Sequence, residues 1–132
     1  MSLTLTIRGM VPASPNRFYS QHWTKRYAIK KQWLVQFLAP ENWPEAREWC
    51  KGVAGQPARK LKVSFHVLTD RLMDPDNLVG SVKIPLDAMK PAGAGYIFDD
   101  NPALLELAVT QQKVKRADRA TVIVLEAAQD TR

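Results

Sequence analysis

The chain has 132 residues, of which 45% are hydrophobic, and its 19 Lys and Arg against 13 Asp and Glu give a net charge of +6. This length suits one domain, residues 1–132, with one modest core. No stretch approaches the roughly 20 apolar residues that span a bilayer, and the N-terminus lacks the basic start and apolar block of a signal peptide. The single Cys50 excludes an internal disulfide and a multi-cysteine zinc site. We therefore expect a cytoplasmic protein with no membrane partner.

The first 60 residues predict one strand followed by helical segments. Alternating apolar and polar side chains up to Gly9 are typical of a half-buried strand. Ile29, Trp33 and Phe37 recur at the spacing of one helix face, and Pro40 ends that pattern. The predicted elements are a strand at 3–9, a turn-rich segment at 11–23, a helix from Thr24 as its cap to about Ala39, a short amphipathic helical turn at 44–52 and a loop at 52–60.

The second half predicts three further elements. Residues 61–67 alternate like a strand, and apolar residues recur at helical spacing through 77–90, with Asp76 near the helix start and a kink expected at Pro85. Residues 104–127 resemble a hairpin, in which a basic turn joins a first strand to a second, apolar strand, 122–125, that we expect in the middle of the sheet.

The stretch "MDPDNLVG", residues 73–80, has two interpretations. Asp, Asn and Pro are what a chain uses to turn and to cap a helix. In extended backbone, however, Asp74 and Asp76 would leave on the same side, and two converging carboxylates are ligands for a hard cation such as Mg²⁺. Asp100, the second acid of the pair Asp99–Asp100, would complete such a site. A calcium loop of the EF-hand type is excluded, because Leu78 stands where its fifth position needs Asp or Asn.

Lys83 bears on the choice between these interpretations. It lies seven residues after Asp76, two turns of a continuous helix, and would share its face. A cation beside a metal-carboxylate cluster suits a phosphodiester substrate, whose phosphoryl oxygens gain charge during reaction. The alternative is an ordinary surface lysine.

Other functional signals are weaker. His22 and His66 have no partner acid or nucleophile nearby in sequence, so each is expected to be a surface or packing residue. We expect Trp33 and Trp43 to pack in the core. Residues 24–31 and 112–119 together hold eight cations and one acid, a pattern that either attracts phosphate backbones or forms a solvated face.

At this point the motifs resemble a known family. "DPDN", then a helix with "KIPLDAM", a Gly-bearing loop and "DD" is similar to the RusA family of Holliday junction resolvases, and "VPASPNRFY" resembles that family's opening turn. The likeness follows nearly the whole chain in order, although only residues 74–100 are specific. Two departures stand out: Met73 replaces a residue that is often basic in the family, and the stretch from Asn77 to Lys83 is about one helical turn longer than in the best-known member.

The resemblance implies a fold, a ligand set, partners and a bacterial or phage-infected cell as the setting. The fold would be α+β, with two layers: a mixed sheet of about four to five strands packed by two main helices, in a homodimer. Asp74, Asp76 and Asp100 would bind Mg²⁺, or Mn²⁺ in its place, with Lys83 as the catalytic lysine, Asn77 and Asp99 in support, and no organic cofactor. Candidate DNA contacts are Asn16, Arg17, Lys25, Arg26, Lys30, Lys31, Arg71, Lys113, Lys115, Arg116 and Arg119.

The expected function is therefore a Mg²⁺-dependent endonuclease that resolves four-way junctions or other branched DNA by paired symmetric nicks. Two alternatives stay open. The acids could be helix caps only, in a non-catalytic basic DNA-binding module, or the chain could be a structural phage protein without a nucleic-acid role.

Overall fold

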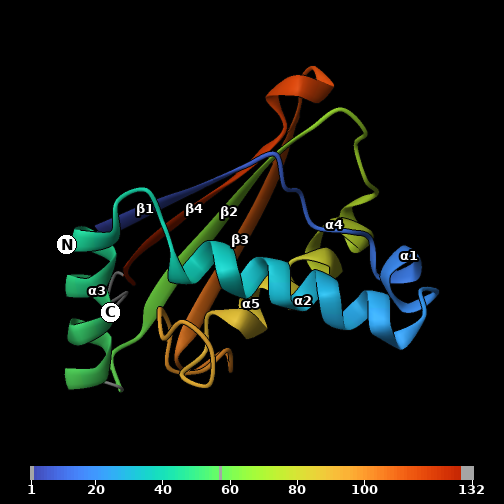
Figure 1. The fold of residues 1–132 in the computed structure, drawn as a ribbon. Helices are drawn as coiled ribbons and strands as arrows, with labels where there is room; N and C mark the ends of the chain where they lie inside the picture. The colour runs from blue at the N-terminus through green and yellow to red at the C-terminus, as the bar shows by residue number, and fades with distance from the viewer. Residues whose placement is uncertain (1, 57, 129–132) are drawn as a thin grey trace.

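The computed structural model describes residues 2–56 and 58–128, and its centre is a four-stranded mixed sheet (Figure 1). The strands are β1 (Ser2–Arg8), β2 (Leu61–Thr69), β3 (Leu105–Lys113) and β4 (Ala120–Ala127), in the order β1-β4-β2-β3. β4 is antiparallel to both of its neighbours, whereas β2 and β3 are parallel. The expected α+β class with a mixed sheet is confirmed, with four strands.

Within these residues, five α-helices and one short 3₁₀ turn connect the strands. They are α1 (Pro15–Tyr19), α2 (Trp23–Leu38), α3 (Trp43–Gly55), α4 (Pro75–Ser81), α5 (Lys83–Ala88) and η1 (Arg116–Asp118). In Figure 1, α2 extends across the sheet toward α1 and α4, while α3 lies near the opposite ends of the strands. The two long helices are thus α2 and α3. The long helix expected at 77–90 is replaced by the two short helices α4 and α5.

The helices cover one face of the sheet. Side chains at alternate strand positions are fully buried on that face, among them Leu5, Val63, Phe65 and Ile123. Trp33 and Phe37 of α2 pack into the same core, and their rings stack with centroids 5.9 Å apart. The other face is more open, with His66 exposed and bonded to Thr110, which gives a core of one helical layer on one sheet.

The predicted hairpin at 104–127 is wrong, because β3 and β4 do not pair with each other. β2 lies between them, and only the central position expected for 122–125 is confirmed. The side chains explain the arrangement: β4 is apolar at consecutive positions and suits a place between two strands, whereas most side chains of β3 are exposed or half-buried and suit a sheet edge.

The helix expected over 77–90 is divided at Val82, which separates α4 from α5. Pro85 accounts for the break, since it has no N–H to donate to the carbonyl of Ser81, the last residue of α4. The predicted kink is therefore confirmed and is strong enough to end one helix. The helix also starts earlier than expected, because Asp74 is the N-cap and Asp76 lies in the first turn.

Three smaller expectations change. The N-cap of α2 is His22, whose Nδ1 accepts a hydrogen bond from the backbone N–H of Thr24, so Thr24 is not the cap. Trp43 is 59% exposed and does not pack in the core, a place that Trp49 takes. α3 is longer than the predicted turn, and Cys50 on it is half-buried, which raises the pKa of its thiol. Among the helices of the described ranges, none has the length and apolar character to cross a bilayer.

Candidate nucleic-acid interface

A groove of about 610 Å³ lies where β2 ends and α2 begins. Four cations line it, namely Arg17, Lys25, Arg71 and Arg119, against the single acid Asp70. They come from α1, from α2, from the loop after β2 and from the residue before β4, so the tertiary structure gathers them from distant parts of the chain. All four were predicted DNA contacts.

Hydrogen bonds hold the groove's walls in place. The hydroxyl of Thr121 donates to the carbonyl of Met10 at 2.8 Å and anchors the loop after β1. The Thr69 hydroxyl accepts from the N–H of Arg71 at 3.2 Å, which shapes the turn that carries this arginine. Gln111 of β3 bonds both backbone groups of Met73, at 2.9 and 2.7 Å. Sequence reasoning missed Gln111, because no local pattern reveals a bond across 38 residues. It also missed Thr69, although that bond spans only two residues.

Among the four cations, Arg119 combines an acidic neighbour with an unused buried donor. Its Nε lies 4.0 Å from Oδ1 of Asp70, too far for a hydrogen bond, and is buried without a partner among the described residues. A buried N–H that no protein acceptor satisfies is costly, and a phosphate oxygen is the type of acceptor that arginine binds best. The groove therefore has the charge and unused donor capacity of an anion-binding surface.

The other predicted DNA contacts lie outside this groove. The remaining residues of α1 and α2 are Asn16, Arg26, Lys30 and Lys31, and those of the β3–β4 connection are Lys113, Lys115 and Arg116. All are exposed except Arg26, which is half-buried. The last three flank Arg119 in sequence at the same end of the sheet, since Lys113 pairs with Thr69 at the end of β2.

The acidic motif begins where the groove ends. Met73 lines the groove, and Asp74 follows it directly as the N-cap of α4. Asp74 makes no capping hydrogen bond with its side chain, and its backbone carbonyl accepts from Leu78 instead. The carboxylates of Asp74 and Asp76 are exposed. Asp74 therefore does not serve as a side-chain cap, which removes one support from the turn-and-cap interpretation.

The positions of Lys83 and Asn77 differ from those that the predicted continuous helix would give. Because the helix is broken at Val82, the spacing of seven residues no longer places Lys83 on the face of Asp76. Lys83 is exposed at the first position of α5, and Asn77 is half-buried in α4. Their predicted roles stay predictions, now without the argument from a continuous helix.

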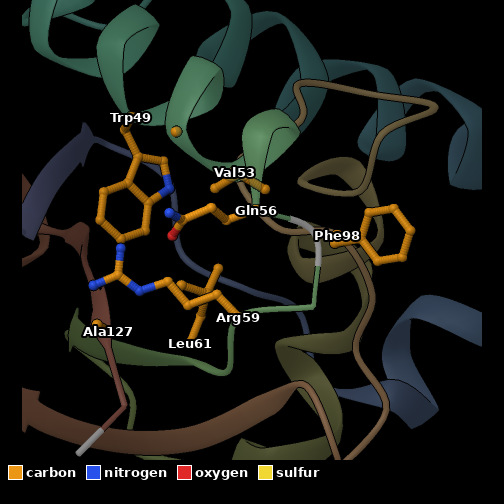
Figure 2. A pocket seen from close by; sticks show the side chains of 8 residues that line it. Trp49, Val53, Gln56, Arg59, Leu61, Phe98 and Ala127 are labelled. Atoms are coloured by element: carbon orange, nitrogen blue, oxygen red, sulfur yellow. The ribbon is translucent and has the colours of Figure 1, made fainter.

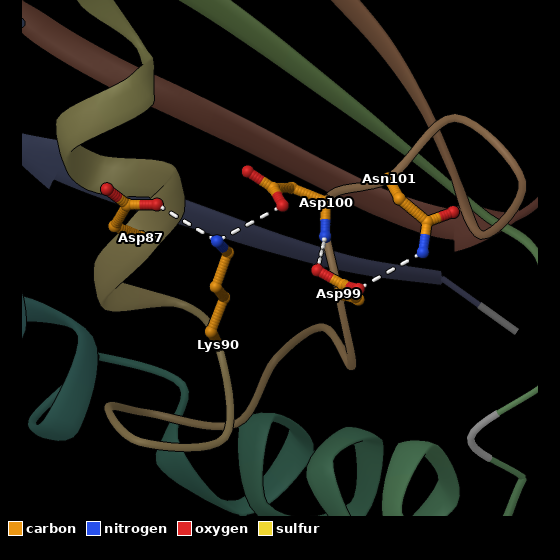
Figure 3. Close-up of polar contacts among 5 residues, drawn as sticks. All are labelled: Asp87, Lys90, Asp99, Asp100 and Asn101. Atoms are coloured by element: carbon orange, nitrogen blue, oxygen red, sulfur yellow. Dashed lines mark hydrogen bonds and ion pairs between the residues drawn. The ribbon is translucent and has the colours of Figure 1, made fainter.

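Asp99 and Asp100 form a separate polar cluster (Figure 3). Nζ of Lys90 lies 3.1 Å from Oδ1 of Asp100 and 3.2 Å from Oδ1 of Asp87, and the bond to Asp100 raises the pKa of the lysine. Asp99 accepts the backbone N–H of Asp100 at 2.8 Å and the amide of Asn101 at 3.1 Å, and these bonds lower the pKa of its carboxyl. Lysine thus takes the place beside Asp100 that was expected for a metal.

The three predicted metal ligands are not brought together. Within residues 2–56 and 58–128, no group of three or more His, Cys, Asp or Glu is placed to hold a metal ion. The parallel register explains this, since Leu61 pairs with Leu105 and the start of β3 therefore lies beside the start of β2. Asp74 follows the end of β2, and the nine residues of this strand separate its two ends by about 26 Å. Asp74 and Asp76 both stand at the start of α4, where the backbone is helical from Pro75 and not extended as expected, and the expected set of three carboxylates is corrected.

A second, much smaller cavity of about 40 Å³ lies at the start of β2 (Figure 2). Trp49, Val53 and Gln56 form one side, and Leu61 and Ala127 belong to the sheet. Phe98 is 47% exposed at its rim, near the polar cluster of Asp99. Its apolar lining fits a packing gap between α3 and the sheet.

Comparison with protein-family models and with curated proteins adds no relative. The chain matches no protein-family model, and no curated protein has significant sequence similarity to it. The likeness to RusA therefore depends on the motifs quoted above.

Proposed function

We propose that this protein binds branched DNA through the cationic groove and cuts it beside the Asp74–Asp76 pair, as a structure-selective endonuclease of the RusA type. One observation carries the proposal: a groove lined by four cations ends at Met73, the residue before Asp74. A phosphate backbone held in that groove would continue toward two exposed carboxylates. The order of motifs along the chain, from the strand into "DPDN", supports the same assignment.

Phosphate binding follows from the charges. Arg17, Lys25, Arg71 and Arg119 would each displace a counterion from DNA, so affinity should fall steeply as salt rises. Such contacts orient DNA without reading its sequence. This matches a protein that recognises the shape of a junction.

The metal part of the proposal fits two residues. The carboxylates of Asp74 and Asp76 stand two positions apart at one helix start, and Mg²⁺ accepts such oxygen ligands while it keeps several waters. Bound there, Mg²⁺ would supply charge neutralisation and a more acidic water. Asp100 does not fit the same site, because Lys90 holds its carboxylate near the opposite ends of the strands.

That misfit favours a second candidate, the non-catalytic DNA-binding module. The groove alone would account for its function. The two candidates agree on binding and differ only on cleavage, so the tests separate the two steps.

Binding is tested with a synthetic four-way junction and a duplex of equal length. Arg71→Ala and Arg119→Ala should each weaken junction binding several-fold and lower the slope of log affinity against log salt by about one. Arg47→Ala is the matched control, because Arg47 is an exposed arginine on α3, near the opposite ends of the strands. Equal binding by all variants would contradict the groove as the DNA-binding site. A wild type without salt-dependent binding would contradict a DNA-binding role and favour the structural phage protein.

Cleavage is tested on the same junction with Mg²⁺ or Mn²⁺. Asp74→Asn and Asp76→Asn should abolish paired nicks and leave junction binding intact. Lys90→Ala should leave cleavage unchanged, because Lys90 and Asp100 lie near the opposite ends of the strands from Asp74. A wild type that binds junctions tightly but never nicks them would replace the nuclease with the binding module.

A further inference from the structure

The net positive charge of this protein comes from one end of the sequence. The first 40 residues contain six of the 19 cations and none of the 13 acids, so the remaining residues carry 13 of each. The net charge of +6 therefore comes entirely from this segment, which forms β1, α1 and α2.

Two large aromatic side chains are exposed within this cationic segment. Trp23 is 64% and Tyr27 is 65% exposed, and they stand four residues apart on α2, so they share one helix face. Lys31 follows at the same spacing, and Lys30 flanks it. We refer to Trp23 and Tyr27 as the aromatic pair.

The indole of Trp23 has a neighbour that orders it. The ring of His22 lies against it with centroids 5.7 Å apart. His22 is itself fixed as the N-cap of α2, with Nδ1 2.9 Å from the hydroxyl of Thr24. The exposed indole is therefore part of a preformed surface.

The aromatic pair lies on a different side of α2 from the groove. The residues of α2 that line the groove are Lys25, Ala28, Ile29, Gln32 and Trp33. At about 100° per residue, their mean direction is well separated from that of Trp23 and Tyr27. Groove and aromatic pair are thus two flanks of one helix, and α2 could contact two arms or strands of a branched molecule.

We propose that the aromatic pair is a stacking platform for unpaired bases of single-stranded DNA, with Lys30 and Lys31 holding the adjacent phosphates. This rests on the proposed function and adds to it a preference for branched DNA that has unpaired bases. Base stacking on exposed aromatic rings among cations is how proteins bind single strands without reading sequence. DNA supplies the negative charge that complements these lysines and the flat base faces that stack on the two aromatic rings.

A second copy of the chain is a poorer occupant of this surface. A symmetric contact through the aromatic pair would bring together the α2 helices of the two copies, each of which carries Lys25, Arg26, Lys30 and Lys31. No acid lies within the first 40 residues to compensate them. Such like-charge contacts oppose association.

The test uses oligothymidylate of about 12 nucleotides and a duplex of the same length, measured by fluorescence anisotropy. Trp23→Ala should weaken binding of the single strand about tenfold and leave the duplex unchanged, because loss of one stacking partner affects only unpaired bases. Trp23→Phe should restore most of the loss. Trp43→Ala is the matched control, since Trp43 is similarly exposed, at 59%, but lies between Glu41 and Glu45.

The outcomes separate this inference from the proposed function. If the wild type binds junctions but Trp23→Ala binds the single strand as tightly as the wild type does, only the stacking platform is wrong. If Trp23→Ala converts a dimer into a monomer by sedimentation, the surface is an interface between copies and the platform is also wrong. If the wild type binds no DNA, both proposals fail. Thermal melts of each variant confirm that it is folded.

Discussion

Tyr96 shows how a single buried residue ties three segments together. Its hydroxyl donates to the carbonyl of Phe37 in α2, and its own carbonyl accepts the indole N–H of Trp49 in α3 at 2.8 Å. Its ring also packs edge-on against Phe37. These contacts hold the chain three residues before Asp99, so they position the polar cluster against both long helices.

This residue gives stability a dependence on pH. Burial raises the pKa of Tyr96 from 10.0 to about 12, so the unfolded chain loses this proton first. The contribution is full below pH 10 and is lost as pH rises toward 12, by about 3 kcal/mol in all. Tyr96→Phe should be less stable than the wild type near neutral pH by about 1–3 kcal/mol, because the carbonyl of Phe37 loses its hydrogen-bond donor. Because phenylalanine has no proton to lose, the variant should also lose less stability than the wild type above pH 10. Urea unfolding at several pH values checks this, and parallel curves for the two proteins would contradict it.

Lys90 illustrates what residue spacing could not reveal. The sequence places Lys90 ten residues from Asp100, and no helix or strand period brings those positions together. The turns after α5 do so, with Gly93 and Gly95 both bonded to the carbonyl of Lys90. A carboxylate that was assigned to a metal on the basis of motif order is therefore paired with an ammonium group.

Among the elements, α4 depends on a close contact with α1. A side chain at Gly80 would place its Cβ 2.7 Å from Cγ of Pro15, closer than atoms pack. The absence of a Cβ at this position lets the start of α1, which carries Arg17 of the groove, lie against the helix that carries Asp76. The contact thus links the groove to the acidic pair.

Gly80→Ala tests that contact. The rigid Pro15 ring cannot move aside easily, so the overpacking should cost about 1–3 kcal/mol and outweigh the helix-propensity gain of about 0.5–1 kcal/mol. Gly52→Ala is the matched control: it lies in α3, where the added methyl group would meet no neighbouring atom within 4 Å, and should gain about 0.5–1 kcal/mol. Melting temperatures that rise for both variants would mean that α1 and α4 can separate without penalty.

At the scale of the whole molecule, the groove and the acidic Lys90 cluster lie near different ends of the strands. The cationic groove and the aromatic pair lie on α1, α2 and the loop after β2, whereas the Lys90 cluster lies near the opposite ends of the strands. Val35 and Leu38, which are 51% and 62% exposed, form a further apolar surface on the last turns of α2. The homodimer stays a prediction. Its reason is that the proposed paired nicking of a junction would require two active sites.

The dimer prediction is tested by sedimentation equilibrium. The wild type should have about twice the mass of one 14.9 kDa chain, and Leu38→Glu should shift it toward the monomer, because a charge would be buried in an apolar contact. Gln36→Glu is the control, since it adds the same charge at a polar exposed position of α2. A wild type that remains at 14.9 kDa at every concentration would contradict the dimer.

The sequence by itself determined the local elements: the alternation of β1 and β2, the apolar stripe of α2 and the break at Pro85 all follow from side chains within one or two turns of each other. Only the tertiary structure decided which segments meet. β4 entered between β1 and β2, four cations from distant positions came to line one groove, and Asp100 came to lie beside Lys90 and not beside Asp74. The physical reason is that strand order and loop paths are chosen by burial of the whole core, whereas periodicity records only the face that each element buries.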